Sequence, residues 1–266
     1  MAVNPFPPSG SITFPPLLNA HAVPFPKPKL LAEKKSAMDQ KIGELRQRRA
    51  DIAQGGGQQR IEKQHAAGKL TARERVEKLV DRGSFQEIGG FAKHRATYFG
   101  MAEKETPADG VVTGCAMVDG RLVHLASQDF TVCGGTAGET HCAKITEMMQ
   151  LSLKTGSPFV FINDSGGARV QEGIDSLAGY ASVFYNNVLL SGSVPQISLI
   201  CGPCAGGAAY SPALTDFIIQ TKTSAAIHYG TAGHQAGHWR SGDQRRIGWS
   251  RGADEPLWCG SPYRGR

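Results

Sequence analysis

The chain has 266 residues, 40% of them hydrophobic, and a formal net charge of +6 at pH 7. That length suffices for one large α/β domain or two small ones. No run of 18 apolar residues occurs, so no membrane helix is predicted, and the start lacks the features of a secretory signal or of an organelle transit peptide. We expect a cytoplasmic protein.

The positive charge lies at the two ends of the chain. Residues 1–37 carry +3 and residues 221–266 carry +4, which leaves −1 for residues 38–220. A nucleic-acid partner is therefore not expected for the central part. The six cysteines have no zinc-like spacing with histidine, so we predict reduced thiols and no metal site.

Residues 1–30 contain eight of the 15 prolines, which predicts a disordered Pro-rich leader over residues 1–37, with Met38 as the true start. Apolar residues at helical spacing predict an amphipathic helix over 38–54, ended by the three glycines at 55–57. A second helix follows, with a break at Gly68. A third begins near Thr71, where Glu74 completes the pattern of a capping box.

Residues 111–128 contain two β-rich runs joined by Asp119-Gly120, which predicts a hairpin. Helices are predicted over 139–155 and 171–190, and buried strands over 157–163 and 194–202. Alternation of strand and helix requires crossover connections and predicts a layered α/β fold.

Two segments share the pattern of apolar strand, glycine turn and helix: FVFINDSGGAR, ending at Arg169, and ISLICGPCAGGAAY, ending at Tyr210. Glycine allows positive φ and close approach of a ligand to the main chain, and a helix start leaves N–H groups unpaired. The two turns could therefore hold an oxyanion such as a thioester enolate. GGT at 134–136 could form another turn of the same pocket.

Other interpretations stay open. Paired glycines also permit tight turns or close packing, and neither phosphate-loop pattern is present. Cys201-Gly202-Pro203-Cys204 has the spacing of a redox pair, although its surroundings disfavour that chemistry. Arg169 could bind phosphate or carboxylate, or form a structural salt bridge. The basic residues between 60 and 75 could meet a phosphorylated cofactor, although a solvated helix face is favoured.

Four stretches, RIEKQHAAGKLTARERVEKLVD, SQDFTVCGGTAGETH, FINDSGGARVQEG and ICGPCAGGAAYSPALTDFIIQTK, resemble the carboxyltransferase β-subunit of biotin-dependent acyl-CoA carboxylases, of the propionyl-/methylcrotonyl-CoA type. The resemblance covers roughly residues 38–222. It implies a crotonase-like fold, a spiral of strands wrapped by helices. It also implies transfer of a carboxyl group from carboxybiotin to the α-carbon of an acyl-CoA, through an enolate held by backbone N–H groups. The residues assigned as catalytic are Gly166, Gly167, Gly206 and Gly207, and those assigned to substrate binding are Ser165, Ala168, Arg169, Gly134, Gly135 and Ala205.

The resemblance also implies partners. Biotin would be carried by a biotin carboxylase/biotin carrier α-subunit, because the chain lacks an AMKM-type biotinylation site and an ATP-binding element. Family members form hexamers from chains with two crotonase-like halves, and this chain matches the first half. We therefore expect a truncated chain that is inactive alone. The alternative is a non-catalytic fragment for acyl-CoA binding or assembly, and the preferred acyl chain stays open.

Residues 223–266 have no apolar periodicity, whereas the family continues with a segment like FITGPxVIKxVTGE. Suitable codons for Ile227 onward, read one base later, encode Phe-Ile-Thr-Gly-Pro-Gln-Val-Ile-Lys-Gln-Val-Thr-Gly-Glu. We therefore predict a frameshift near Ser224–Ala226 and a tail without a native fold. The nucleotide sequence of the gene tests this, because the shifted frame should encode the second half. The predicted domains are thus 1–37, 38–222 and 223–266.

Overall fold

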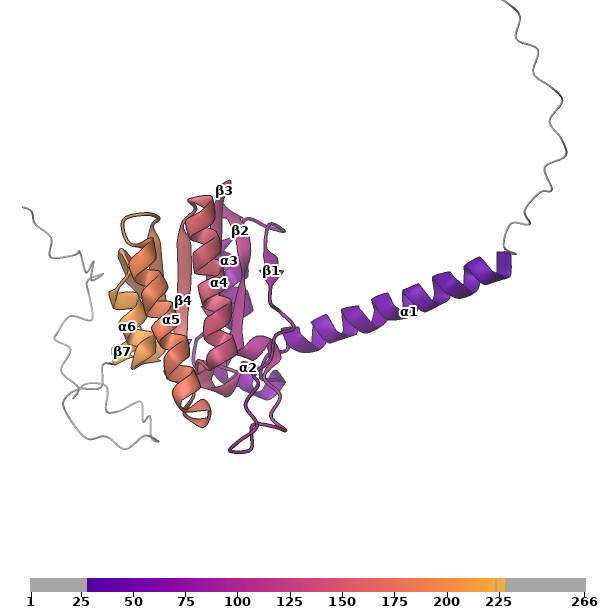
Figure 1. Cartoon of the computed structure of the whole chain (residues 1–266), viewed down its shortest axis with the longest axis horizontal. Coiled ribbons are helices and arrows are strands. Elements are labelled where there is room, and N and C mark those ends of the chain that lie inside the picture. Colours follow the sequence, from indigo (N-terminus) through magenta and orange to yellow (C-terminus); the bar gives the residue numbers. More distant parts are fainter. Residues whose placement is uncertain (1–27, 223, 228–266) are drawn as a thin grey trace, which may run out of the picture. The chain divides into compact units, whose positions relative to one another are not determined.

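The computed structural model describes residues 28–222 and 224–227 (Figure 1). The chain divides into two units, residues 1–46 and residues 47–266. In the first unit the described residues belong to helix α1 (Pro28–Ala53), which begins earlier than the Met38 that the sequence indicated. Proline is compatible with a first helical turn because its missing N–H would have no partner there. The remainder of the predicted leader lies outside the described residues.

Two short helices follow α1, as predicted. They are α2 (Gln58–Ala66) and α3 (Ala72–Leu79), and residues 67–71 separate them. The Thr71 hydroxyl accepts a hydrogen bond from the Glu74 N–H, and the Glu74 carboxylate accepts one from the Thr71 N–H. The capping box is therefore confirmed, and it fixes the start of the helix that carries Arg73 and Arg75.

The described residues form one seven-stranded mixed sheet in the order β1-β2-β3-β4-β5-β6, and β7 also pairs with β5. Strands β1, β2 and β3 are antiparallel neighbours, whereas β4, β6 and β7 pair in parallel with β5, and β3 pairs in parallel with β4. The strands are β1 (Gln86–Ile88), β2 (Val111–Val118), β3 (Arg121–Gln128), β4 (Phe159–Ser165), β5 (Gln196–Ala205), β6 (Phe217–Gln220) and β7 (Ala225–Ile227).

Several sequence predictions hold closely. Strands β2 and β3 form the predicted hairpin, with Asp119 (φ 49°) and Gly120 (φ 71°) at the turn. Helix α4 (Glu139–Thr155) has the predicted bounds, and α5 (Ile174–Leu190) begins three residues later than predicted. The helix after the second glycine turn is α6 (Gly207–Ala213), and three short 3₁₀ turns complete the elements: η1 (Pro107–Gly110), η2 (Cys133–Gly135) and η3 (Val170–Glu172).

Two predicted boundaries were wrong. Strand β5 continues to Ala205, three residues past its predicted end at Gly202. A β-carbon at Gly202 would lie 2.0 Å from an Asp164 carboxylate oxygen, and this explains the glycine there. Strand β7 lies within residues 223–266, so regular pairing extends past the boundary predicted at 222. Residues 228–266, the rest of the predicted tail, lie outside the described residues.

Alternate residues of the strands pack into cores on the two faces of the sheet. Phe159 and Phe161 of β4 pack with α4 and α5 on one face. Val160 and Ile162 pack with α3 on the other. Figure 1 shows α4 and α5 side by side along the strands. Strand β4 is therefore packed on both faces of the sheet.

Helix α5 is apolar on its exposed side as well as its buried side. Tyr180, Val183 and Leu190 are buried in the core. A helix that is apolar all round is normally covered on all sides. Its exposed large apolar residues are Ile174, Leu177, Tyr185, Val188 and Leu189.

No helix among the described residues has the length and apolar composition required to cross a membrane. In the same part of the chain, no group of three or more His, Cys, Asp or Glu side chains is arranged to hold a metal ion.

Candidate functional site

The two glycine turns predicted from the sequence lie next to each other. Strands β4 and β5 are parallel neighbours, and Ser165 at the end of one pairs with Cys204 near the end of the other. Gly167 has φ +97°, and a β-carbon there would lie 2.6 Å from Ala205 O. The first turn therefore packs directly against the second, and only glycine fits at the contact.

The third predicted turn joins the same cluster. Gly134 and Gly135 lie in η2 with positive φ, and the Gly166 N–H donates to Gly134 O at 3.0 Å. A β-carbon at Gly135 would lie 2.2 Å from Asp164 O. The three glycine turns thus pack together, and Gly135 and Gly167 are required by close contacts between main chains.

The N–H groups of Gly166 and Gly167, predicted to be the main oxyanion donors, have acceptors within the chain. The Gly166 N–H is bound to Gly134 O, and the Gly167 N–H donates to the hydroxyl of buried Ser165 at 3.1 Å. Ser165 therefore holds the turn, and its hydroxyl accepts from the main chain. An N–H group that already has an acceptor is not available for a substrate oxygen.

Other N–H groups of the turns do lack an acceptor. Among the described residues, none accepts a hydrogen bond from the N–H of Ala168 or Gly207. Ala168 follows Gly167, and Gly206 follows Ala205, so both flank the contact between the turns. Gly206 has φ 54° and precedes α6, whose first N–H groups have no partner within the helix. These partly exposed groups are the donors that the site can offer.

Arg169 does not reach a ligand, contrary to its assignment to substrate binding. Its side chain is fully buried and pairs with Asp109 at 2.6 Å and with Glu172 at 2.8 Å. Its guanidinium also donates to Thr136 O at 2.8 Å. Of the two interpretations of Arg169, the structural salt bridge is therefore confirmed. The sequence could not identify Asp109 as the partner, because it lies 60 residues earlier.

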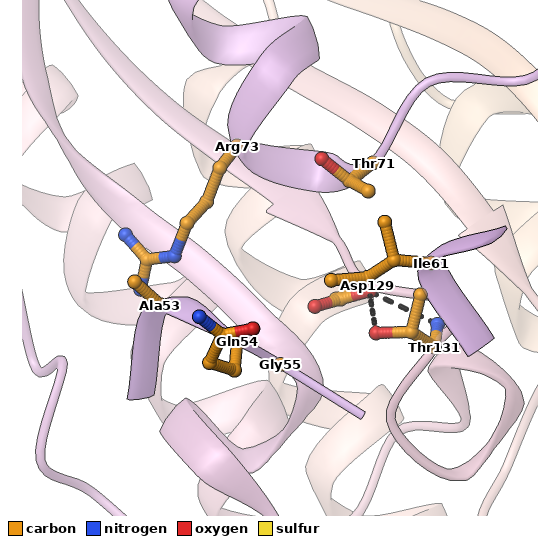
Figure 2. Close-up of a pocket in the computed structure, with 8 residues that line it drawn as sticks. All are labelled: Ala53, Gln54, Gly55, Ile61, Thr71, Arg73, Asp129 and Thr131. Carbon is orange, nitrogen blue, oxygen red and sulfur yellow. Dashed lines mark hydrogen bonds between the residues drawn. The ribbon is translucent and has the colours of Figure 1, made fainter. Parts of the chain in front are cut away.

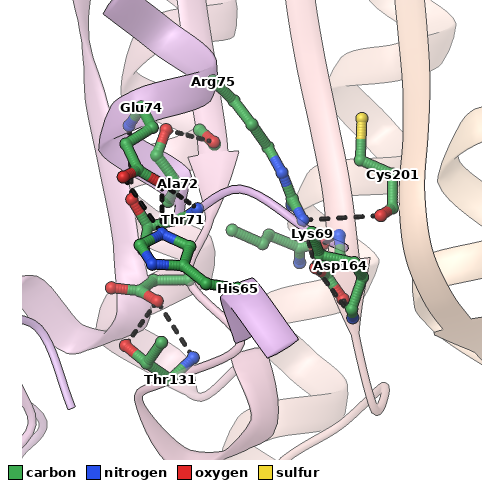
Figure 3. A network of polar contacts seen from close by, with 12 residues as sticks. His65, Lys69, Thr71, Ala72, Glu74, Arg75, Thr131, Asp164 and Cys201 are labelled. Atoms are coloured by element: carbon green, nitrogen blue, oxygen red, sulfur yellow. Dashed lines mark hydrogen bonds and ion pairs between the residues drawn. The ribbon is translucent and has the colours of Figure 1, made fainter. Parts of the chain in front are cut away.

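A second ion cluster lies at the end of β4 and was not predicted (Figure 3). The buried Asp164 carboxylate pairs with Arg75 at 2.6 Å and more loosely with Lys69 at 3.4 Å. Arg75 also donates to Cys201 O at 3.4 Å, which links α3 to β5. The expectation of a solvated basic face is therefore wrong for these two side chains, although Lys63 is exposed.

The cysteine pair has no redox character. Cys201 and Cys204 lie within β5, and all five described cysteines are free. Burial raises the pKa of the Cys201 thiol, and it raises the pKa of the Cys204 thiol to about 12. Reactive thiols require a lowered pKa, so we interpret the two cysteines as structural residues of β5 and not as a redox pair.

Two cavities lie beside the three glycines at 55–57. An open one of about 520 Å³ is bordered by these glycines, Arg60, Glu105, Pro107 and Val132. A small one of about 20 Å³ lies next to it, with Asp129 and Thr131 hydrogen-bonded in its wall (Figure 2). The Gly56 N–H donates to the Thr131 hydroxyl, so the glycines are fastened to the loop that leads into η2. The small cavity is lined by Ala53, Gln54, Gly55, Ile61, Thr71, Arg73, Asp129 and Thr131.

Main-chain N–H groups lie together where two strands of the sheet end. Adjacent parallel strands end in glycine turns, and N–H groups beside the contact of these turns have no acceptor among the described residues. Such groups stabilise negative charge that develops on a substrate oxygen.

Comparison with known proteins shows the family of the chain. Residues 63–242 match the family model of the carboxyl transferase domain, and the chain belongs to that family. It is 60% identical over 187 residues to the methylmalonyl-CoA carboxyltransferase 12S subunit of Propionibacterium freudenreichii subsp. shermanii, covering 70% of this chain and 36% of that protein. It is 56% identical over 183 residues to the propionyl-CoA carboxylase beta chain of Roseobacter denitrificans, covering 69% and 36%.

A solved structure extends the likeness to three dimensions. The structure of transcarboxylase 12S, described as a hexamer with methylmalonyl-coenzyme A and methylmalonic acid bound, matches with a TM-score of 0.70 and 60% identity, over 70% of this chain and 36% of that one. The fold is therefore crotonase-like, as predicted. The chain spans about a third of the length of these relatives.

Proposed function

We propose that this chain provides the acyl-CoA-binding part of a carboxyltransferase of the propionyl-CoA/methylmalonyl-CoA type. The observation that carries the proposal is the pair of N–H groups of Ala168 and Gly207, which have no acceptor among the described residues and lie beside the contact between two glycine turns. The substrate class is supported by the CoA esters in the names of relatives that are 56–60% identical.

The N–H groups would bind the thioester carbonyl oxygen. Removal of the α-proton by a base, for which we assign no residue of this chain, would move negative charge onto that oxygen, and donors already in place would stabilise it without rearrangement. Loss of one such donor typically slows a reaction by about 100- to 1,000-fold. Donors that bind the charged oxygen more strongly than the neutral carbonyl favour the enolate over the ground state, which is what catalysis requires.

Carboxybiotin, carried by a biotin carboxylase/biotin carrier α-subunit, would supply the carboxyl group when bound. We assign no residue of this chain to hold it. A homo-oligomeric assembly is proposed as well, since a structure 60% identical to this chain is described as a hexamer.

The proposal is tested by calorimetry with two ligands that differ at one group. Propionyl-CoA has the thioester carbonyl, whereas S-propyl-CoA, a thioether, has a methylene in its place. We expect the chain to bind propionyl-CoA about 10-fold more tightly, because two hydrogen bonds to a carbonyl contribute about 1–2 kcal/mol together. Equal affinity for the two ligands, or no binding of either, would contradict the proposal.

An acyl-CoA-binding or assembly fragment without turnover is the second candidate, and it is favoured by the share of the relatives that the chain covers, 36%. A carboxylation assay with propionyl-CoA and carboxybiotin separates the two. Binding of propionyl-CoA without carboxylated product would support the fragment, whereas product would support the complete activity. Calorimetry with acetyl-CoA and methylcrotonyl-CoA would then show which acyl chain is preferred.

A further inference from the structure

Four polar side chains beneath the glycine turns have no role in the chemistry proposed above. They are fully buried, so each lost its hydration on folding and must be compensated by hydrogen bonds. Replacing a whole buried polar network by well-packed apolar side chains is often neutral for stability, so a network that is kept calls for a reason. The four residues are Gln128, His141, Asp109 and Arg169.

Hydrogen bonds link three of these residues, one after another, to the end of β4. The Asp164 N–H, at the end of β4, donates to the Gln128 amide oxygen at 3.3 Å. The Gln128 amide nitrogen lies 3.3 Å from His141 Nε2, and His141 Nδ1 lies 2.8 Å from Asp109 O. A carbonyl oxygen can only accept, so Nδ1 carries the proton and Nε2 accepts from Gln128. Burial, with Arg169 nearby, lowers the pKa of His141 to about 3, which keeps the ring neutral and preserves this arrangement.

Asp109 lies in a strained turn. Ala108 has φ 51° and Asp109 has φ 47°, two consecutive non-glycine residues in the left-handed region, and both are buried. Such conformations persist only where the surroundings hold them, and they concentrate at functional sites. The Lys144 ammonium group holds this turn, since it donates to Ala108 O at 2.6 Å and to Val111 O at 2.5 Å.

Arg169 connects the strained turn to the Ala168 N–H, because Asp109 binds its side chain and Ala168 is its neighbour in the chain. The Asp109 carboxylate fixes the guanidinium, which also binds Thr136 O and Glu172. The main chain of Arg169 is fixed as well, because its N–H donates to Ala137 O at 2.9 Å. Ala168, whose N–H has no acceptor among the described residues, directly precedes Arg169 and follows Gly167.

We propose that Asp109 and His141 are positioning residues, which set the direction of the Ala168 N–H toward a thioester carbonyl by fixing Arg169. The inference rests on the proposed function, because it assumes that this N–H binds the carbonyl. Neither side chain touches the ligand. Their replacement should therefore affect recognition of the carbonyl and leave the rest of the CoA contacts unchanged.

The test compares propionyl-CoA with S-propyl-CoA in calorimetry for a set of variants. Asp109→Asn keeps the size of the side chain and suits the left-handed turn, since asparagine tolerates that conformation. We expect it to reduce the preference for the thioester from about 10-fold to less than about two-fold, with unchanged affinity for the thioether. Asp119→Asn is the matched control, because Asp119 has φ 49° in an exposed hairpin turn, and it should retain the full preference.

Variants of His141 provide a second test, which remains valid if the Asp109 variant does not fold. His141→Asn places an amide N–H near the position of Nδ1 and can still donate to Asp109 O, whereas His141→Gln places its amide near Nε2 and cannot. His141→Asn removes more volume from the core than His141→Gln, so a purely structural role predicts the larger effect for the asparagine variant. We expect the asparagine variant to retain the preference for propionyl-CoA and the glutamine variant to lose it.

The possible results distinguish failure of the positioning role from failure of the proposed binding of acyl-CoA. A wild-type chain without preference for the thioester would overturn the proposed function and the inference together. A wild-type preference that survives in both Asp109→Asn and His141→Gln would overturn the inference alone. So would equal loss of affinity for both ligands in these variants, since that result indicates general disruption of the site.

Discussion

Replacement of Gly167 by alanine probes the contact on which the site geometry depends. An L-residue at φ +97° is strained by about 1–2 kcal/mol. The new methyl carbon would also lie 2.6 Å from Ala205 O, and over-packing of this kind costs about 1–3 kcal/mol. We therefore expect Gly167→Ala to lower the free energy of unfolding by about 3 kcal/mol, and the melting temperature by about 6–12 °C.

Gly156→Ala is the matched control for this measurement. Gly156 ends α4 with φ 67°, and a β-carbon there would have no neighbour within 4 Å. Its replacement introduces the backbone strain without the contact, so we expect a loss of about 1 kcal/mol. Urea unfolding followed by circular dichroism measures both variants. If the two lose the same stability, the turns do not pack against each other as described.

Three further predictions concern buried charge, pH and the exposed face of α5. Arg169→Met leaves Asp109 and Glu172 buried without their cation, so urea unfolding should show a loss of about 3–5 kcal/mol, whereas the same change at exposed Arg121 should cost less than about 0.5 kcal/mol. The pKa of His141, lowered from 6.5 to about 3, means that the unfolded chain takes up a proton first as pH falls. Stability should then decline by about 4 kcal/mol between pH 6.5 and 3, and His141→Asn should flatten this part of the pH profile. On a sizing column we expect self-association through α5, which Leu177→Lys with Tyr185→Lys should reduce, and a clean wild-type monomer would contradict this.

Much of the fold was predictable because it depends on local patterns. The bounds of α4, the capping box at Thr71 and the hairpin turn at Asp119 follow from spacing and from single residue types. The meeting of the glycine turns was also predictable, because parallel neighbouring strands end at the same edge of a sheet. The short strands β1, β6 and β7 were not predicted, since three or four residues carry no clear period and pair only where an edge is offered.

The errors at the site concern contacts between residues far apart in the chain. Nothing near Arg169 in sequence identifies Asp109 as its partner, and nothing near Asp164 identifies Arg75. The acceptors of the Gly166 and Gly167 N–H groups depend on how η2 and Ser165 are oriented in the folded chain. A motif can therefore predict which turns meet without predicting which of their N–H groups have acceptors within the chain.

Paired glycines can permit close packing or expose main-chain N–H groups to a ligand, and in these turns the two roles are related. Gly167 is required for packing, because its neighbour is the carbonyl of Ala205 rather than a ligand. That close approach brings the first turn beside the second, so the following residues, Ala168 and Gly206, flank the same contact. Side chains larger than hydrogen at 167 would separate the turns and with them the N–H groups that we propose bind the carbonyl. Packing by one residue thus creates the donor geometry at its neighbours, and an alanine can occupy a donor position that the motif suggests for glycine.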